Sequence, residues 1–435
     1  MGLRAALLLA VLLPCVPLSF FRPFIGVICW TIISFAGPQW YAWGAAYYFP
    51  CAEMIAIPTM LGFVVYSRGW LRMVSRETIL MGILWTWFTI TTLVSVNTPL
   101  FAAHSDMTMY RWQFISKVLL MTVITMGIVD TFARLRILVM VTAGCFAFYV
   151  VKALPLMITT GGGFRLYGPP RSMVEDNNDL GLALNMTLPL LFYVWQTETG
   201  RRLRQLFFGL FIITIPGIFF TYSRGAMTGL VAVMTLMLLK SKQRLVLLPV
   251  VVMGLVLGLV FAPPAWKERM DFTRKGAALD NSAFSRLNSW QFARNLAWDY
   301  PIFGGGFDTF TKELFDRYAP NSNDVHGPHS IYFGVLAEHG YVGLALYLSL
   351  VVSCFASLRK IGKHARRMGD EVASAYANAF GFSLVGFLTS GLFLGRAYFD
   401  YYFAIICCIV VLKHVCFNEW RKMEQEEYMD ARAVA

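Results

Sequence analysis

Long apolar runs recur along the whole sequence, and they decide what the chain can fold into. Each is long enough to cross a hydrocarbon core of about 30 Å as a helix. Backbone polar groups have no partner in lipid, so such runs must be helical. We therefore predict an all-α integral membrane protein, a polytopic bundle of about 12 transmembrane helices. The clear runs are 51–66, 78–96, 113–129, 137–158, 179–196, 205–222, 225–240, 245–262, 330–356, 372–394 and 399–417.

The stretch 3–36 is harder to interpret. Pro14, Pro17 and Pro23 interrupt it, so it could form two short crossings, or a broken hairpin followed by a crossing. Arg4 and the apolar residues after it superficially resemble a signal peptide. No small-residue cleavage site follows, so we expect this stretch to be part of the structure.

The formal net charge of +12 does not indicate a nucleic-acid partner. The basic residues cluster in short connections between the apolar runs, as the positive-inside rule expects, and they form no separate basic domain. If those connections face the cytoplasm, both termini lie there too, and the number of crossings is even. The basic connections are 68–76, 134–136, 201–204, 240–244 and 359–367.

The opposite side of the membrane then receives the longer connections, which carry the candidate functional residues. Residues 263–329 form the largest of them and are too aromatic for a disordered linker. We expect this segment to be a large periplasmic loop that contains helices. The predicted organisation is an N-terminal bundle (1–262), this loop, and C-terminal helices with a cytoplasmic tail (330–435).

Arg224 lies in the sequence Tyr222–Ala226, where two apolar runs meet with almost no loop. An arginine at such a place costs several kcal/mol unless it faces water or an anion. The alternative is an arginine that extends its charged end to the membrane interface.

Residues 284–298 have apolar side chains at helical spacing, which predicts an amphipathic helix on or near the membrane. Arg286, Trp290 and Arg294 share one face of it. Guanidinium groups clamp phosphate oxygens, and a tryptophan beside them suits a sugar. A surface helix resting on anionic lipid headgroups is the alternative.

His326 and His329 precede the run 330–356, with Pro328 expected in its first turn. A helix N-terminus disfavours imidazolium, so we expect His329 to be neutral and able to accept a proton. Further along this run, Glu338 is followed directly by His339. An ionisable pair at membrane depth is a candidate functional site, although it could serve only to tie helices together.

The connection 160–178 adds further candidates. Its glycines do not match a nucleotide-binding spacing, but Arg165 and Arg171 could contribute to an anion site. The acidic run 175–179 could bind a divalent cation, yet it also suits a helix N-cap, which we prefer. The cysteines have no metal-ligand spacing, so we predict no metal site and no cofactor.

Several of these motifs, taken together with their spacing, resemble the O-antigen ligase and polymerase superfamily. Residues 176–179 and the N-terminal third are similar to ligase-like members associated with exosortase systems. Where the superfamily often has Asn after the loop histidine, this chain has Ser330. The motifs are Ser223-Arg224-Gly225-Ala226, Ser285-Arg286 with Trp290, Pro301 with Gly304-Gly305-Gly306-Phe307, and His329-Ser330 leading to Glu338 and Gly340.

The resemblance implies a metal-independent glycosyltransferase of the bacterial inner membrane. Such enzymes move a glycan from undecaprenyl pyrophosphate to an acceptor on the periplasmic face. In the ligases, which we favour, the acceptor is the lipid A core oligosaccharide. In the polymerases it is another lipid-linked repeat unit, and in protein O-oligosaccharyltransferases a serine or threonine.

The resemblance also assigns roles to residues. His329 would be the catalytic base, and Arg224 and Arg286 would bind the donor pyrophosphate, with Arg165 and Arg171 as weaker extrapolations. A transporter or flippase of a lipid-linked or anionic substrate is the rival from another class, although candidate residues crowded at one face favour an enzyme. The further candidates are His326, Arg294, Trp290 and Glu338.

Overall fold

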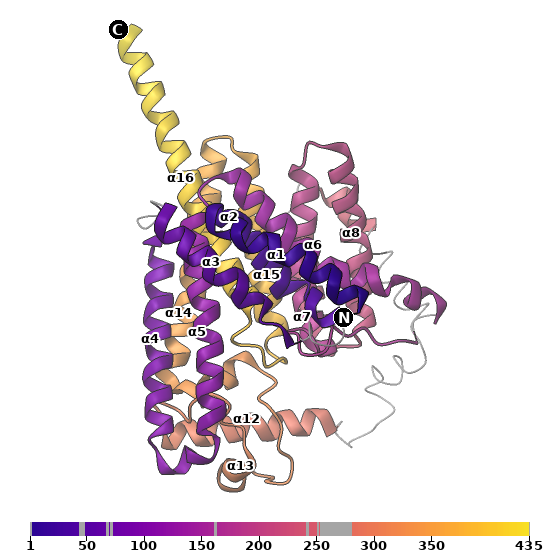
Figure 1. Ribbon diagram of the computed structural model, residues 1–435, viewed down its shortest axis with the longest axis vertical. Helices are drawn as coiled ribbons and strands as arrows, with labels where there is room; N and C mark the ends of the chain where they lie inside the picture. Colours follow the sequence, from indigo (N-terminus) through magenta and orange to yellow (C-terminus); the bar gives the residue numbers. More distant parts are fainter. Residues whose placement is uncertain are drawn as a thin grey trace.

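The computed structural model is a bundle of helices, and the residues it describes form no strand (Figure 1). The all-α prediction is therefore confirmed for this part of the chain. The described residues are 2–42, 48–66, 69, 73–160, 163–240, 243–249, 252 and 281–434. The main helices are α1 (Leu3–Phe21), α2 (Pro23–Phe35), α3 (Cys51–Tyr66), α4 (Arg76–Val96), α5 (Ser105–Ile128), α6 (Phe132–Thr159), α7 (Asn177–Thr197), α8 (Arg201–Phe220), α9 (Arg224–Lys240), α12 (Asn281–Asp299), α14 (Ile331–Arg367), α15 (Glu371–Ser390) and α16 (Asp400–Val434).

Among the described residues, 7 helices are long and apolar enough to cross a membrane, namely α1, α4, α6, α8, α14, α15 and α16. Two shorter apolar helices, α2 and α3, accompany them. The protein is therefore a helical membrane protein, while the number of about 12 crossings stays a prediction. Most of the expected span 245–262 lies outside the described residues, as does the first part of the expected loop, up to residue 280.

The N-terminal stretch forms two helices that meet at Arg22. Helix α1 continues through Pro14 and Pro17, so these prolines do not break it. Membrane helices tolerate proline where neighbouring groups satisfy the freed backbone carbonyls. In α1 the two prolines leave the carbonyl oxygens of Ala10 and Leu13, one turn earlier, without their usual helical donors.

The positions of the two termini bear on the expectation that both lie on one side of the membrane. Arg4 borders the same cavity as Phe164 and Tyr167, which belong to a connection expected on the side opposite the C-terminus. The C-terminal part of α16 projects from the other end of the molecule (Figure 1). This arrangement does not support an even number of crossings, and the side of the membrane on which each terminus lies stays a prediction.

Helix α7 forms the centre of the bundle. It packs against α6, α8, α9 and α15, and its residues from Leu180 to Val194 are all buried. Asn185, in the middle of α7, donates hydrogen bonds to the carbonyl oxygen of Ala226 (2.7 Å) and to the Ser390 hydroxyl (3.2 Å). Buried amide groups of this kind fix the register between neighbouring helices.

Helix α12 lies across one end of the bundle, close to the short helix α13 (Lys312–Tyr318) (Figure 1). The predicted helix at 284–298 is thereby confirmed. Its apolar face packs against protein, because Phe292 and Leu296 share a buried cluster with Phe315 and Ala337. The face expected to rest on lipid is therefore covered mainly by α13 and α14.

Candidate active site

A break in α14 lies two residues after Glu338, which lines the candidate site. Gly340 has φ 68° within this helix, a left-handed conformation that favours glycine. The segment 301–306 packs into the break, where the Gly305 amide donates to the carbonyl oxygen of Ala337 (2.8 Å) and the Gly306 amide to that of Glu338 (2.9 Å). The glycines at 304–306 therefore allow the two backbones to approach closely, and this contact holds Glu338 in position.

Glu338 is buried in the wall of a cavity of about 490 Å³. Its carboxylate accepts hydrogen bonds from the Tyr398 hydroxyl (2.6 Å) and from the backbone amide of Asp308 (3.0 Å). Burial raises the pKa of Tyr398 well above its usual value, and the neighbouring Glu338 adds to this effect. Arg111, which pairs with Asp308 at 3.3 Å, and Arg396 line the same cavity.

His329 lies just outside this cavity, on the segment that leads into α14. The structure begins α14 at Ile331, with Ser330 as the N-cap, so Pro328 and His329 precede the helix rather than form its first turn. The backbone of His329 has φ 43°. A Cβ added to Gly395 would lie 3.3 Å from the His329 nitrogen, so these two backbones are in contact.

The surroundings of His329 favour the neutral imidazole. Burial lowers its pKa below the usual 6.5, and the charges of Arg286 and His326 lower it further, while Asp176 opposes them. The neutral state predicted from the sequence agrees with this direction. The main cause is burial rather than the helix terminus.

Helix α12 holds the histidine segment in position. The Trp290 indole N–H donates to the carbonyl oxygen of Pro328 (2.9 Å), and the Ser289 hydroxyl donates to that of His326 (3.1 Å). The Trp290 ring also stacks on Phe333 at 5.0 Å. Trp290 is therefore engaged in packing and positioning, one helical turn after Arg286.

The turn between α8 and α9 brings Arg224 to the same end of the bundle. Gly225, the next residue, packs against Phe393 and Leu394, which lie directly before Gly395 in the connection between α15 and α16. The turn that carries Arg224 and the segment that carries His329 therefore both contact this short connection.

Arg165 lies close to this turn, with its guanidinium 5.8 Å from the ring centroid of Tyr222. Its loop is attached to the end of α8, because the Leu166 amide donates to the carbonyl oxygen of Phe220 (2.8 Å). Asn177 fixes the turn from the other side, donating to the carbonyl oxygen of Thr221 (2.7 Å). Arg165 and Arg224 thus flank one turn.

Other predicted residues lie elsewhere. The guanidinium of Arg171 lies over the ring of Tyr48, at 5.1 Å, toward the N-terminal helices. Arg294 is exposed on α12, and His326 pairs with Asp324 at 2.8 Å. Of the stripe expected on α12, Arg286 and Trp290 lie near His329, whereas Arg294 faces solvent.

The acidic run is a helix cap, as preferred from the sequence. Asp176 is the N-cap of α7, and its carboxylate accepts a hydrogen bond from the Asn178 amide (2.8 Å). Asp179, in the first turn, pairs with Arg396 at 2.6 Å. This pair ties the start of α7 to the connection between α15 and α16.

Sequence reasoning missed Arg396, Arg111 and Tyr398. Arg396 lies beside a glycine between two apolar runs, as Arg224 does, and this similarity could have indicated it. No sequence pattern pairs Tyr398 with Glu338, because they meet only through folding.

Comparisons with known protein families cover much of the chain that forms this site. Residues 209–348 match a family model described as O-Antigen ligase. The chain contains a domain of the O-antigen ligase family. This match confirms the resemblance to the O-antigen ligase and polymerase superfamily. The O-antigen ligase domain includes Arg224, Arg286, His329 and Glu338.

The remaining comparisons add little about activity. Residues 3–195 match a model of a family of unknown function, which includes Arg165 and Arg171. No curated protein matches the chain. The O-antigen ligase domain is characteristic of membrane glycosyltransferase-like enzymes.

Proposed function

We propose that this protein is an O-antigen ligase of the bacterial inner membrane, with its active site facing the periplasm. It would transfer a glycan from undecaprenyl pyrophosphate to a sugar of the lipid A core oligosaccharide, in lipopolysaccharide biosynthesis. The observation that carries the proposal is a half-buried imidazole, His329, whose neutral form is favoured by partial burial and by the charge of Arg286.

In this mechanism His329 accepts the proton of the attacking sugar hydroxyl. The hydroxyl oxygen forms a bond to the anomeric carbon while the bond from that carbon to the pyrophosphate oxygen breaks. Attack from the face opposite the leaving group inverts the anomeric centre. The proton on His329 is then released to water, and undecaprenyl pyrophosphate leaves as the anion.

The arginines stabilise the charge that develops on the leaving pyrophosphate. The proximity of Arg286 to His329 supports this role for Arg286. Arg224 is supported by its neighbour Gly225, which packs against the same connection that contacts His329. Arg165, beside Tyr222, would extend the cationic surface from the other side of the turn. Guanidinium groups supply this stabilisation without a metal ion, so the reaction is proposed to be metal-independent.

The test is reconstitution of the purified protein with a lipid-linked donor and lipid A core. We expect His329→Ala to lower the transfer rate by about 10²-fold to 10⁴-fold, and Arg224→Ala or Arg286→Ala by about 10²-fold to 10³-fold. Arg317→Ala, which removes an exposed cation on α13, is the matched control and should retain wild-type activity. Full activity of the His329 variant would refute the general-base role.

The product distinguishes the proposed acceptor from the others that the superfamily uses. Modified lipid A core supports the ligase, whereas elongated lipid-linked chains or modified protein would replace it with a polymerase or a protein glycosyltransferase. Activity should persist in a chelator, and its loss there would refute the metal-free mechanism. A transporter would leave the donor intact and release no undecaprenyl pyrophosphate.

A further inference from the structure

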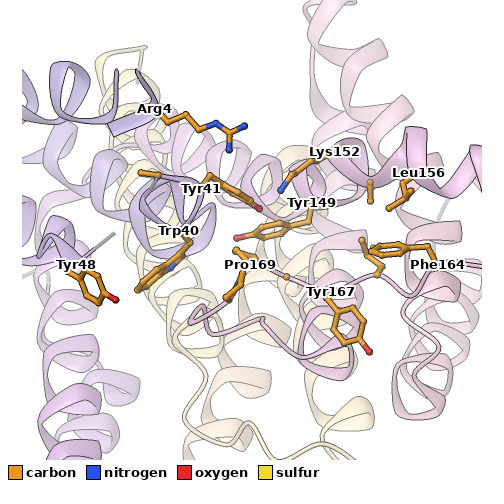
Figure 2. Close-up of a pocket in the computed structure, with 15 residues that line it drawn as sticks. Arg4, Trp40, Tyr41, Tyr48, Tyr149, Lys152, Leu156, Phe164, Tyr167 and Pro169 are labelled. Atoms are coloured by element: carbon orange, nitrogen blue, oxygen red, sulfur yellow. The ribbon is translucent and has the colours of Figure 1, made fainter. Parts of the chain in front are cut away.

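A second cavity, of about 950 Å³, lies between α1, α6 and the loop that carries Arg165. Figure 2 shows the aromatic side chains that line much of it, among them Trp40, Tyr41 and Tyr149. Neither His329 nor Glu338 borders this cavity. It is therefore separate from the candidate active site, although Phe164 and Tyr167 approach it from the neighbouring loop.

The charged groups that line this cavity are Arg4 and Lys152, and no acidic side chain is among its described lining residues. In Figure 2 both cations point toward the space beside Tyr41 and Tyr149. The Lys152 ammonium lies 3.7 Å from the ring centroid of Tyr41, and the two positive charges are close enough to repel each other. A shared anion would remove this repulsion.

The helices around the cavity expose apolar side chains, as surfaces in contact with lipid do. Leu3, Leu7 and Val11 form a stripe along one face of α1, with exposed fractions of 77%, 58% and 68%. On α6, Ile158 is 71% exposed beyond Lys152. Tyrosine and tryptophan with basic residues are typical of the interface between hydrocarbon and headgroups. An occupant must therefore combine an anionic head with apolar chains.

We propose that this cavity is a binding site for the phosphate group of an anionic glycerophospholipid of the surrounding bilayer. Arg4 and Lys152 bind the phosphate, and the acyl chains lie along the exposed stripe of α1. The aromatic rings cover the glycerol region. The lipid would thereby join α1 to α6 and support the loop that holds Arg165 near Tyr222.

The test measures lipid binding to the purified full-length protein in mixed micelles of phosphatidylglycerol or phosphatidylcholine. Each cation near an anionic headgroup contributes a free energy that corresponds to about fivefold in affinity, so two predict a preference of about 30-fold for phosphatidylglycerol. The double variant Arg4→Gln/Lys152→Gln should lose this preference, whereas Lys152→Arg, which keeps the charge, should retain it.

A matched control separates a specific site from net charge. The double variant Lys312→Gln/Arg317→Gln removes two exposed cations from α13 and should keep the wild-type preference. Inorganic phosphate should not compete at millimolar concentration if the acyl chains contribute. An unchanged preference in the Arg4/Lys152 variant, an equal loss in the α13 control, or full displacement by inorganic phosphate would each overturn the proposal.

The thermal unfolding midpoint in lipid-free detergent checks that the variants fold. If the double variant has a lower midpoint, the single variants Arg4→Lys and Lys152→Arg carry the test, because they preserve both charges. A site for phosphate requires that these two variants bind phosphatidylglycerol as the wild-type protein does. Loss of binding in both would show that charge is not what the cavity recognises.

Discussion

The chemistry of His329 depends on residues that are distant in sequence. Burial and the nearby Arg286 set its protonation state, and Gly395 contacts its backbone. The sequence motifs could indicate His329 and Arg286, because their residue types and spacing carry the resemblance. They could not indicate the left-handed backbone of His329 or the contact with Gly395. Both arise from packing against the connection between α15 and α16.

The proximity of Arg286 predicts a change in the pH dependence of transfer. The neutral imidazole is the active form, so activity falls as the pH drops through the pKa of His329, which lies below 6.5. Removing the guanidinium in Arg286→Gln removes a charge that lowers this pKa. The pKa therefore rises, and the acid limb of the pH profile moves to higher pH.

Transfer rates measured between about pH 5 and pH 8 would detect this displacement. The Arg317→Gln variant removes a cation in the last turn of α13. It should keep the acid limb of the wild-type pH profile. If the Arg286 variant also kept it while its maximal rate fell, the arginine would act on the substrate without influencing the imidazole.

At the scale of an element, α14 differs most from what its sequence predicts. The apolar run 330–356 predicts a continuous helix, and the structure extends it to Arg367 with a break at Gly340. The run contains Gly334, Gly340 and Gly343, and glycines in an apolar run are compatible with an unbroken helix, so the sequence does not locate the break. Its cause is the segment 301–306, which binds backbone groups that a regular helix would have used internally.

The break predicts a strong effect of Gly340→Ala. A backbone with φ 68° and ψ −172° is essentially restricted to glycine, and it costs a residue with a side chain roughly 1–3 kcal/mol. The added Cβ would also lie 2.3 Å from the carbonyl oxygen of Ile302, a backbone atom that cannot easily move. We expect a loss of stability of at least about 2 kcal/mol together with a loss of transfer activity.

The thermal unfolding midpoint in detergent would measure this change. Gly82→Ala on α4 is the matched control, because nothing lies within 4 Å of the added Cβ and the position is helical. That variant should be neutral or slightly more stable, since alanine is a better helix former. Equal midpoints for the two variants would contradict the role given to the break.

At the scale of the whole molecule, the hydropathy of the chain predicts most helices but not the orientation of the first. The described helices from α3 to α9 and from α14 to α16 correspond to predicted apolar runs. Its prolines leave the N-terminal stretch open to two interpretations, whereas the structure continues α1 through Pro14 and Pro17. Counting basic residues could not place the N-terminus, since Arg4 lines a cavity and does not lie in a basic connection between helices.

This arrangement predicts which positions share a side of the membrane. In a variant without native cysteines, Gly2→Cys and Tyr167→Cys should react with an impermeant maleimide added to the same side. Gln425→Cys, on the projecting part of α16, should react only from the other side. The protein without cysteines is the control for background labelling, and labelling of positions 2 and 425 from one side would contradict the structure.

The connection between α15 and α16 lines the cavity of Glu338 and contacts both the His329 segment and the turn that carries Arg224. Gly395 contacts His329, Arg396 pairs with Asp179, and Tyr398 donates to Glu338. A ligand that moves this connection where it contacts His329 would therefore change the free energy of binding at the turn that carries Arg224. Thermodynamic linkage makes that effect reciprocal, so donor and acceptor would each alter the affinity for the other by the same factor.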